Sequence, residues 1–75
     1  MDPADILNKA TIAVLYEANS QGIDIQELVK QAKGGLMGSR TYAHASAEAK
    51  PKTVAALQGA LEDALNYIEI DQPAG

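Results

Sequence analysis

A glycine-rich, basic stretch in the middle of the chain holds the residue types best suited to bind a ligand. Its candidate anion-binding residues are Gly34, Gly35, Gly38, Ser39, Arg40, Thr41, Tyr42 and His44. Glycines let backbone N–H groups converge on an anion, and an arginine binds phosphate through two hydrogen bonds. The stretch predicts a site for a nucleotide or another small phosphorylated ligand. Its spacing matches no phosphate-binding fingerprint, so a solvated connector without a ligand is the alternative.

Catalytic chemistry has little support among the titratable residues. His44 and Glu48 could share one helical face, but two groups are too few for a metal site, and the chain has no cysteine nucleophile. Glu62 and Asp63 are adjacent, so on a helix they point about 100° apart and cannot act as an acid/base pair. We therefore expect no enzyme activity, no metal and no cofactor.

Two helices that position these residues have clear capping signals. Asp2 is a good N-cap, Pro3 suits the first helical position, and Gly22 is a typical stop, which predicts a helix over 2–21. Asp24 and Glu27 have the spacing of a capping box. Together with Gly34-Gly35 as a stop, they predict a second helix over 24–33.

The remaining helices are predicted from weaker signals. Ser39 can cap a short helix over 39–49. This helix is expected to end at Ala49, because Pro51 disfavours helical geometry at Lys50. The last helix is then expected over 52–70, followed by a frayed tail at 71–75. The fold class is all-α: one domain over 1–70, built as a small three- to four-helix bundle.

The composition predicts a core too small for a monomer. The 75 residues include 14 alanines but no Phe, no Trp and no Cys, so neither aromatic packing nor disulfides can supplement the core. We therefore expect the bundle to be completed by self-association, most simply as a homodimer.

Helical periodicity indicates where that association takes place. The first helix carries a broad apolar arc, expected to face the core: Ile6, Leu7, Ala10, Ala13, Val14, Leu15 and Ala18. The residues outside this arc, or on the seam of the last helix, are the predicted partner or oligomer interface: Ile12, Tyr16, Val54, Leu57, Leu61 and Ile68. Ile12 and Tyr16 are alternatively half-exposed surface residues. Gly59 marks either a close helix crossing or an ordinary surface glycine.

The net charge of −4 conceals a block pattern. Residues 1–29 carry −4, residues 30–52 carry +4, and residues 53–75 carry −4. Three interpretations of the basic block over 30–52 are open: the solvated end of a bundle, an anion site, or half of a complementary contact between subunits.

A helix-turn-helix interpretation has partial support. Ala18, Gly22, Ile23 and Leu28 have the spacing of that motif. The would-be recognition helix, however, begins with Asp24 and Glu27, which repel phosphates. DNA binding is therefore the third hypothesis.

The leading hypothesis is a non-catalytic protein-binding module that docks on a larger partner and inhibits or adapts it, as small acidic proteins of phages and mobile elements do. The acidic start and the lack of an 18-residue apolar stretch predict a cytoplasmic protein without a membrane segment. A nucleotide or anion binder that uses residues 34–44 is the first alternative, and a DNA-binding regulator is the second.

Overall fold

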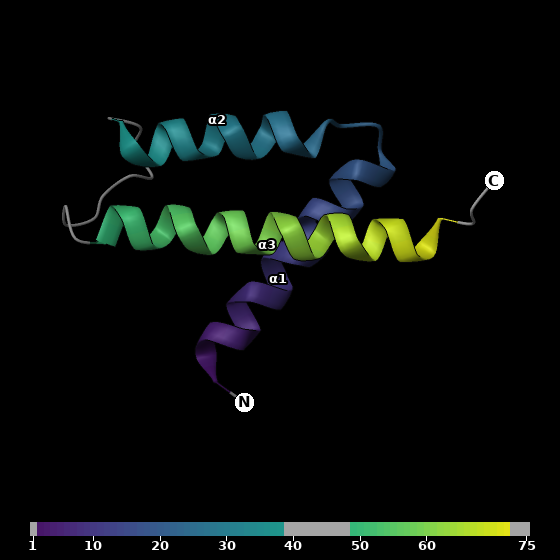
Figure 1. Ribbon diagram of the computed structural model, residues 1–75, viewed down its shortest axis with the longest axis horizontal. Helices are drawn as coiled ribbons and strands as arrows, with labels where there is room; N and C mark the ends of the chain where they lie inside the picture. The colour runs from purple at the N-terminus through teal and green to yellow at the C-terminus, as the bar shows by residue number, and fades with distance from the viewer. Residues whose placement is uncertain (1, 39–48, 73–75) are drawn as a thin grey trace.

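The computed structural model describes residues 2–38 and 49–72, which form three α-helices (Figure 1). They are α1 (Pro3–Ser20), α2 (Ile25–Met37) and α3 (Ala49–Asp71), and the described residues include no strand. The prediction of a small all-α fold is confirmed. The helix predicted over 39–49 falls, except for its last residue, outside the described residues.

The N-caps of α1 and α2 form as the sequence indicates, but only the Asp24 half of the predicted capping box is present, because the Glu27 carboxylate accepts from Gln31 Nε2 at 2.9 Å. The Asp2 carboxylate accepts a hydrogen bond of 2.9 Å from the Ala4 N–H, and Pro3 opens α1. The Asp24 carboxylate accepts bonds of 3.1 and 3.2 Å from the N–H groups of Gln26 and Glu27. Between the helices, Gly22 has a φ of 87°, a backbone conformation that favours glycine.

The predicted end of the second helix is wrong. Gly34 and Gly35 do not stop α2, which continues to Met37. Neither glycine adopts a positive φ, and Gly35 is buried. Helix propensity is a weak preference that burial in the tertiary structure overrides. Here the burial of Gly35 accompanies an additional turn of α2.

The predicted start of the last helix is also wrong. The helix α3 begins at Ala49 rather than at residue 52, so Lys50 is helical despite the proline that follows it. Pro51 lies in the first turn, where the backbone N–H has no partner within the helix and its absence costs nothing. At the other end α3 includes Asp71, which the sequence placed in the tail.

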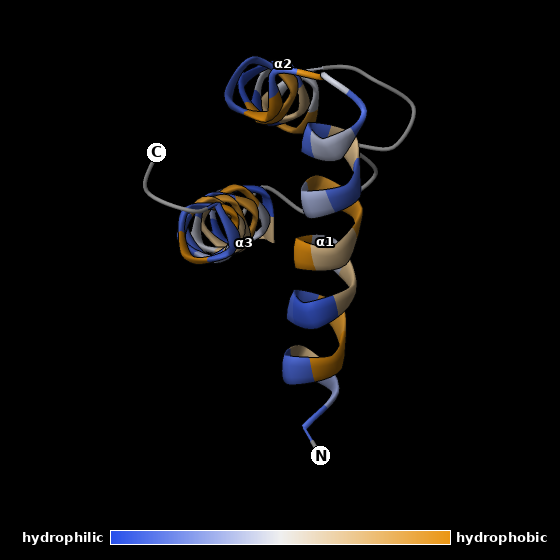
Figure 2. Ribbon diagram, turned by 90° about the vertical axis from the view of Figure 1, so that its right-hand side faces the viewer, coloured by the Kyte–Doolittle hydropathy of each residue, from blue (hydrophilic) through white to orange (hydrophobic). Residues whose placement is uncertain are grey.

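The helices form two layers. Helices α2 and α3 lie side by side and antiparallel, while α1 crosses them on one side and contacts α3 far more than α2 (Figures 1 and 2). The molecule measures 45 × 29 × 15 Å, and its radius of gyration of 13.3 Å exceeds the value of about 11 Å usual for this length. It is therefore a flat object with much surface for its mass.

The core lies where α1 and α2 meet α3. Its members are all aliphatic: Leu15, Ile25, Val29, Ala60, Leu61 and Ala64. Ala60 and Ala64 are the small residues buried in α3, with exposed fractions of 1% and 0%. A Cβ added at Gly59 would meet no atom within 4 Å, so this glycine marks no close crossing within the chain.

Candidate functional site

The three glycines of the predicted anion site lie within helix α2 or at its C-terminal cap. Gly34 and Gly35 lie inside the helix, where backbone N–H groups bond along the helix and cannot converge on an anion. The Gly38 N–H donates to the Gly34 carbonyl at 3.0 Å, and the Gly38 carbonyl accepts from Lys50 Nζ at 3.3 Å. The converging amides that the prediction assumed are therefore absent at these three glycines, because the helix uses them; anion binding by the stretch stays a prediction.

The other residues of that site cannot be placed. Ser39, Arg40, Thr41, Tyr42 and His44 lie outside the described residues. Their proposed contacts to a phosphorylated ligand stay a prediction from the sequence.

The predicted interface residues make contacts within one chain. Leu61 is a buried core residue, and Ile12, Leu57 and Ile68 pack against the same core, while Val54 is half-buried. The first helix therefore presents to α3 the side that carries Ile12, which the sequence assigned to a partner.

Tyr16 lies on the same side of α1 and joins it to the end of α3. Its hydroxyl donates a hydrogen bond of 2.6 Å to Asp71 Oδ2. This bond, then desolvation and the negative charges of Asp71 and Glu17, raises the pKa of the Tyr16 hydroxyl above its ordinary value. Tyr16 is therefore a protonated donor at neutral pH. A second polar contact, from Asn8 Nδ2 to Asp63 Oδ2 at 3.4 Å, joins the same two helices.

The opposite side of α1 is left uncovered, and we call it the α1 outer face. It comprises Ile6, Leu7, Ala10, Ala13, Val14 and Glu17, all exposed. The three largest apolar side chains, Ile6, Leu7 and Val14, are 53%, 68% and 67% exposed. In Figure 2 hydrophobic colour marks the side of α1 turned away from α3. All of these residues except Glu17 belong to the apolar arc that the sequence predicted to face the core. Of that arc, Leu15 is buried in the core and Ala18 packs against it, whereas the other five residues are exposed.

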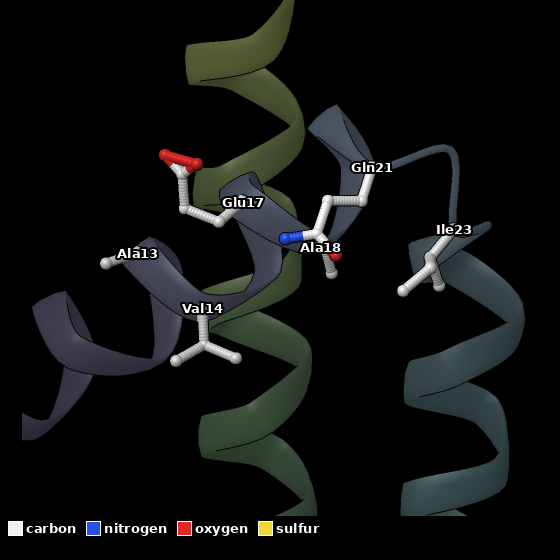
Figure 3. A pocket seen from close by; sticks show the side chains of 6 residues that line it. All are labelled: Ala13, Val14, Glu17, Ala18, Gln21 and Ile23. Atoms are coloured by element: carbon white, nitrogen blue, oxygen red, sulfur yellow. The ribbon is translucent and has the colours of Figure 1, made fainter.

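The α1 outer face borders a shallow depression at the turn into α2 (Figure 3). The depression is lined by Ala13, Val14, Glu17, Ala18, Gln21 and Ile23. Figure 3 shows Val14 on α1 and Ile23 beside α2 on opposite sides of Ala18. Ile23 is 44% exposed. The apolar surface thus continues from α1 across the turn.

No family model, curated protein or solved structure matches this chain.

On the described surface, the exposed apolar side chains of Ile6, Leu7 and Val14 lie together on the α1 outer face. Among residues 2–38 and 49–72, no polar or charged side chain is buried, and no group of three or more carboxylate, histidine or cysteine side chains could hold a metal ion. No helix in the same residues is long and apolar enough to cross a membrane. The start of α2 presents exposed Asp24 and Glu27, as expected from the sequence.

Proposed function

We propose that this protein is a non-catalytic, cytoplasmic protein-binding module that docks on a larger partner through the α1 outer face and inhibits or adapts it. One observation carries the proposal: Ile6, Leu7 and Val14 lie on the same side of one helix, and each is more than half exposed. Single exposed apolar residues are ordinary, but a contiguous group on one face is typical of an interaction site.

The energetics favour a partner that covers this face. Complete burial of an aliphatic side chain is worth about 1.5–3 kcal/mol, so covering the exposed parts of these three contributes on the order of 1 kcal/mol each. The central Ala10 and Ala13 are small and let another helix approach closely.

The charge of the chain narrows the chemistry of the partner. Asp5 and Glu17 are exposed on α1, and the chain has a net charge of −4. A partner with an apolar groove and a basic rim is complementary to this surface, and opposite charges at a rim accelerate association. Small acidic inhibitors encoded by phages and mobile elements match this description.

Site-specific photocrosslinking tests the proposal. A benzophenone side chain at position Ala10, on the α1 outer face, is expected to crosslink a protein larger than the chain itself in cells of the native host. The same group at Asn66, which is exposed on α3, is the matched control and should give no such product. Equal products from both positions, or none from Ala10, would contradict the assignment of this face.

A further inference from the structure

We infer that an arginine side chain of the partner protein binds in a second depression, between α1 and the C-terminal end of α3, with its guanidinium group beside Tyr67 and Asp71. The inference rests on the proposed function, because the arginine belongs to the partner that covers the α1 outer face. It goes beyond that function by naming the chemical group that is recognised and the residues that recognise it.

This depression, which we call the α1–α3 depression, has a volume of about 430 Å³. Its lining residues are Lys9, Ile12, Ala13, Tyr16, Glu17, Tyr67 and Asp71. Its volume lies near the lower end of the range of about 300–1,000 Å³ that is usual for ligand sites. Tyr67 is 52% exposed, so its ring is accessible to an incoming group. The depression therefore has room for one long side chain.

The lining of the α1–α3 depression combines aromatic rings with carboxylates. Tyr16 and Tyr67 supply the rings, and Glu17 and Asp71 supply the carboxylates. A guanidinium group stacks on aromatic faces and binds a carboxylate through two hydrogen bonds, whereas an ammonium group is a compact and strongly hydrated charge. This combination of groups therefore favours arginine over lysine.

The carboxylates have unused capacity to accept hydrogen bonds. Asp71 Oδ2 accepts from the Tyr16 hydroxyl, and within the described part of the chain Asp71 Oδ1 has no partner. The Glu17 side chain makes no hydrogen bond or ion pair with the residues that the structure describes. Both groups can therefore accept from a donor supplied by another chain.

Two helix ends add negative potential at the same place. The last turns of α1 and α3 lie together, since Asn19 and Ser20 line one hollow with Ile68 and Asp71. A helix C-terminus carries roughly half a negative charge, which basic side chains in the last turn often compensate. Neither α1 nor α3 has a basic residue in its last turn. A cation from outside the chain is therefore favoured here.

The Tyr16 hydroxyl reports this potential. The hydrogen bond to Asp71 raises its pKa most, followed by desolvation and then by the negative charges of Asp71 and Glu17. Lys9 also lines the α1–α3 depression, but it lies eight residues before Glu17, about 12 Å along the helix. The end of the depression at Asp71 is therefore anionic, and Lys9 opposes cation binding from the other end.

The α1–α3 depression adjoins the α1 outer face. Ala13 and Glu17 belong to both surfaces. A partner with an apolar groove on the α1 outer face thus brings the rim of that groove to the depression. The basic rim that we propose for the partner then has a defined place for one of its arginines.

Titration with N-acetyl-arginine amide tests the site in the absence of the partner. In about 0.1 M salt, charges more than about 10 Å apart are largely screened, so the measurement reports local groups. In ¹H–¹⁵N spectra, the amide signals that should shift and saturate are those of Ala13, Glu17, Tyr67 and Asp71. The amides of residues 50–55, at the other end of α3, should not shift. N-acetyl-lysine amide has the same charge and should bind at least about twofold more weakly.

Charge variants should change the dissociation constant of the arginine probe in opposite directions. Glu17→Gln removes an attraction and should raise it about two- to fivefold, whereas Lys9→Gln removes a repulsion and should lower it by a similar factor. Tyr67→Leu removes the exposed ring and should raise it about two- to fivefold. Lys52→Gln and Glu62→Gln, at exposed positions of α3, are matched controls and should leave it unchanged.

A second measurement tests the source of the arginine. When Tyr67→Leu is added to the chain that carries benzophenone at Ala10, the yield of the crosslink to the larger protein should fall. An unchanged yield would show that the partner does not use the α1–α3 depression and would overturn the inference.

The outcomes separate this inference from the proposed function. The inference is overturned if the arginine probe gives no saturable shifts, if the lysine probe binds equally well, or if Lys9→Gln weakens binding. If the Ala10 crosslink persists in any of these cases, the proposed function stands. If the arginine probe binds as described but Ala10 gives no crosslink, docking on a partner is lost, and with it the assignment of the arginine to that partner.

Discussion

The Tyr16 hydroxyl lies 2.6 Å from Asp71 Oδ2, so one hydrogen bond joins α1 to the last residue of α3 across 55 positions of sequence. A second contact, from Asn8 to Asp63, joins the same two helices. Both contacts lie on the side of α1 that buries Leu15 in the core and packs Ile12 against it. The α1 outer face is the opposite side of the helix, which these contacts leave uncovered.

Replacement of Tyr16 by Phe should lower the melting temperature, because it removes the hydrogen bond and leaves the aromatic ring in place. Asp71→Asn should also lower it, and the two effects should be less than additive, since both variants lose the same interaction. Circular dichroism melts of the two single variants and the double variant measure this. Fully additive effects would show that the two residues do not interact.

The pH dependence of stability should report the same bond. The folded state raises the pKa of Tyr16, so the unfolded chain loses this proton first as the pH rises. The contribution is fully present below the unfolded pKa, about 10, and is lost as the pH passes through the folded pKa. Urea titrations between pH 8 and pH 11 should show stability falling above about 10. In Tyr16→Phe this component should be missing.

The helical glycines give a test of the backbone. Gly34 lies within α2 and Gly59 within α3, and a Cβ at either position meets no atom within 4 Å. Each change to Ala should stabilise the protein by up to about 1 kcal/mol in chemical denaturation. Gly22→Ala is the contrasting variant. Because Gly22 has a φ of 87°, alanine there should destabilise the protein by about 1 kcal/mol. A destabilising Gly34→Ala would argue that α2 ends at Gly34, as the sequence suggested.

The close packing of α1 and α2 against α3 requires small residues. Ala64 is completely buried, so Ala64→Leu should destabilise the protein by about 1–3 kcal/mol through overpacking. Ala55 is exposed on the same helix, and Ala55→Leu should change the free energy of unfolding by less than about 0.5 kcal/mol. Equal effects at the two positions would place the core elsewhere.

The parts of the fold that the sequence predicts correctly depend on local chemistry. Asp2, Asp24 and Gly22 act on amides or dihedral angles within a few residues, so their effects can be read from neighbouring residues. The continuation of α2 through Gly34-Gly35 depends on tertiary burial, which no local pattern reports.

The orientation of α1 was unpredictable for a different reason. Both sides of this helix carry apolar residues, so periodicity alone cannot tell which side is covered. The side with fewer large aliphatic residues faces α3. There Tyr16 donates a hydrogen bond to Asp71, and Asn8 donates one to Asp63. These partners lie 55 residues away, and only the tertiary fold brings them together. The sequence therefore identifies the residues of the outer face as one apolar group, but predicts that this group faces the core.

Photocrosslinking from position Ala10 in cells of the native host tests most directly whether the α1 outer face is where this protein contacts another protein. The predicted result is a product larger than the chain itself from Ala10 and none from Asn66, which is exposed on α3. Equal products from both positions, or none from Ala10, would contradict the account.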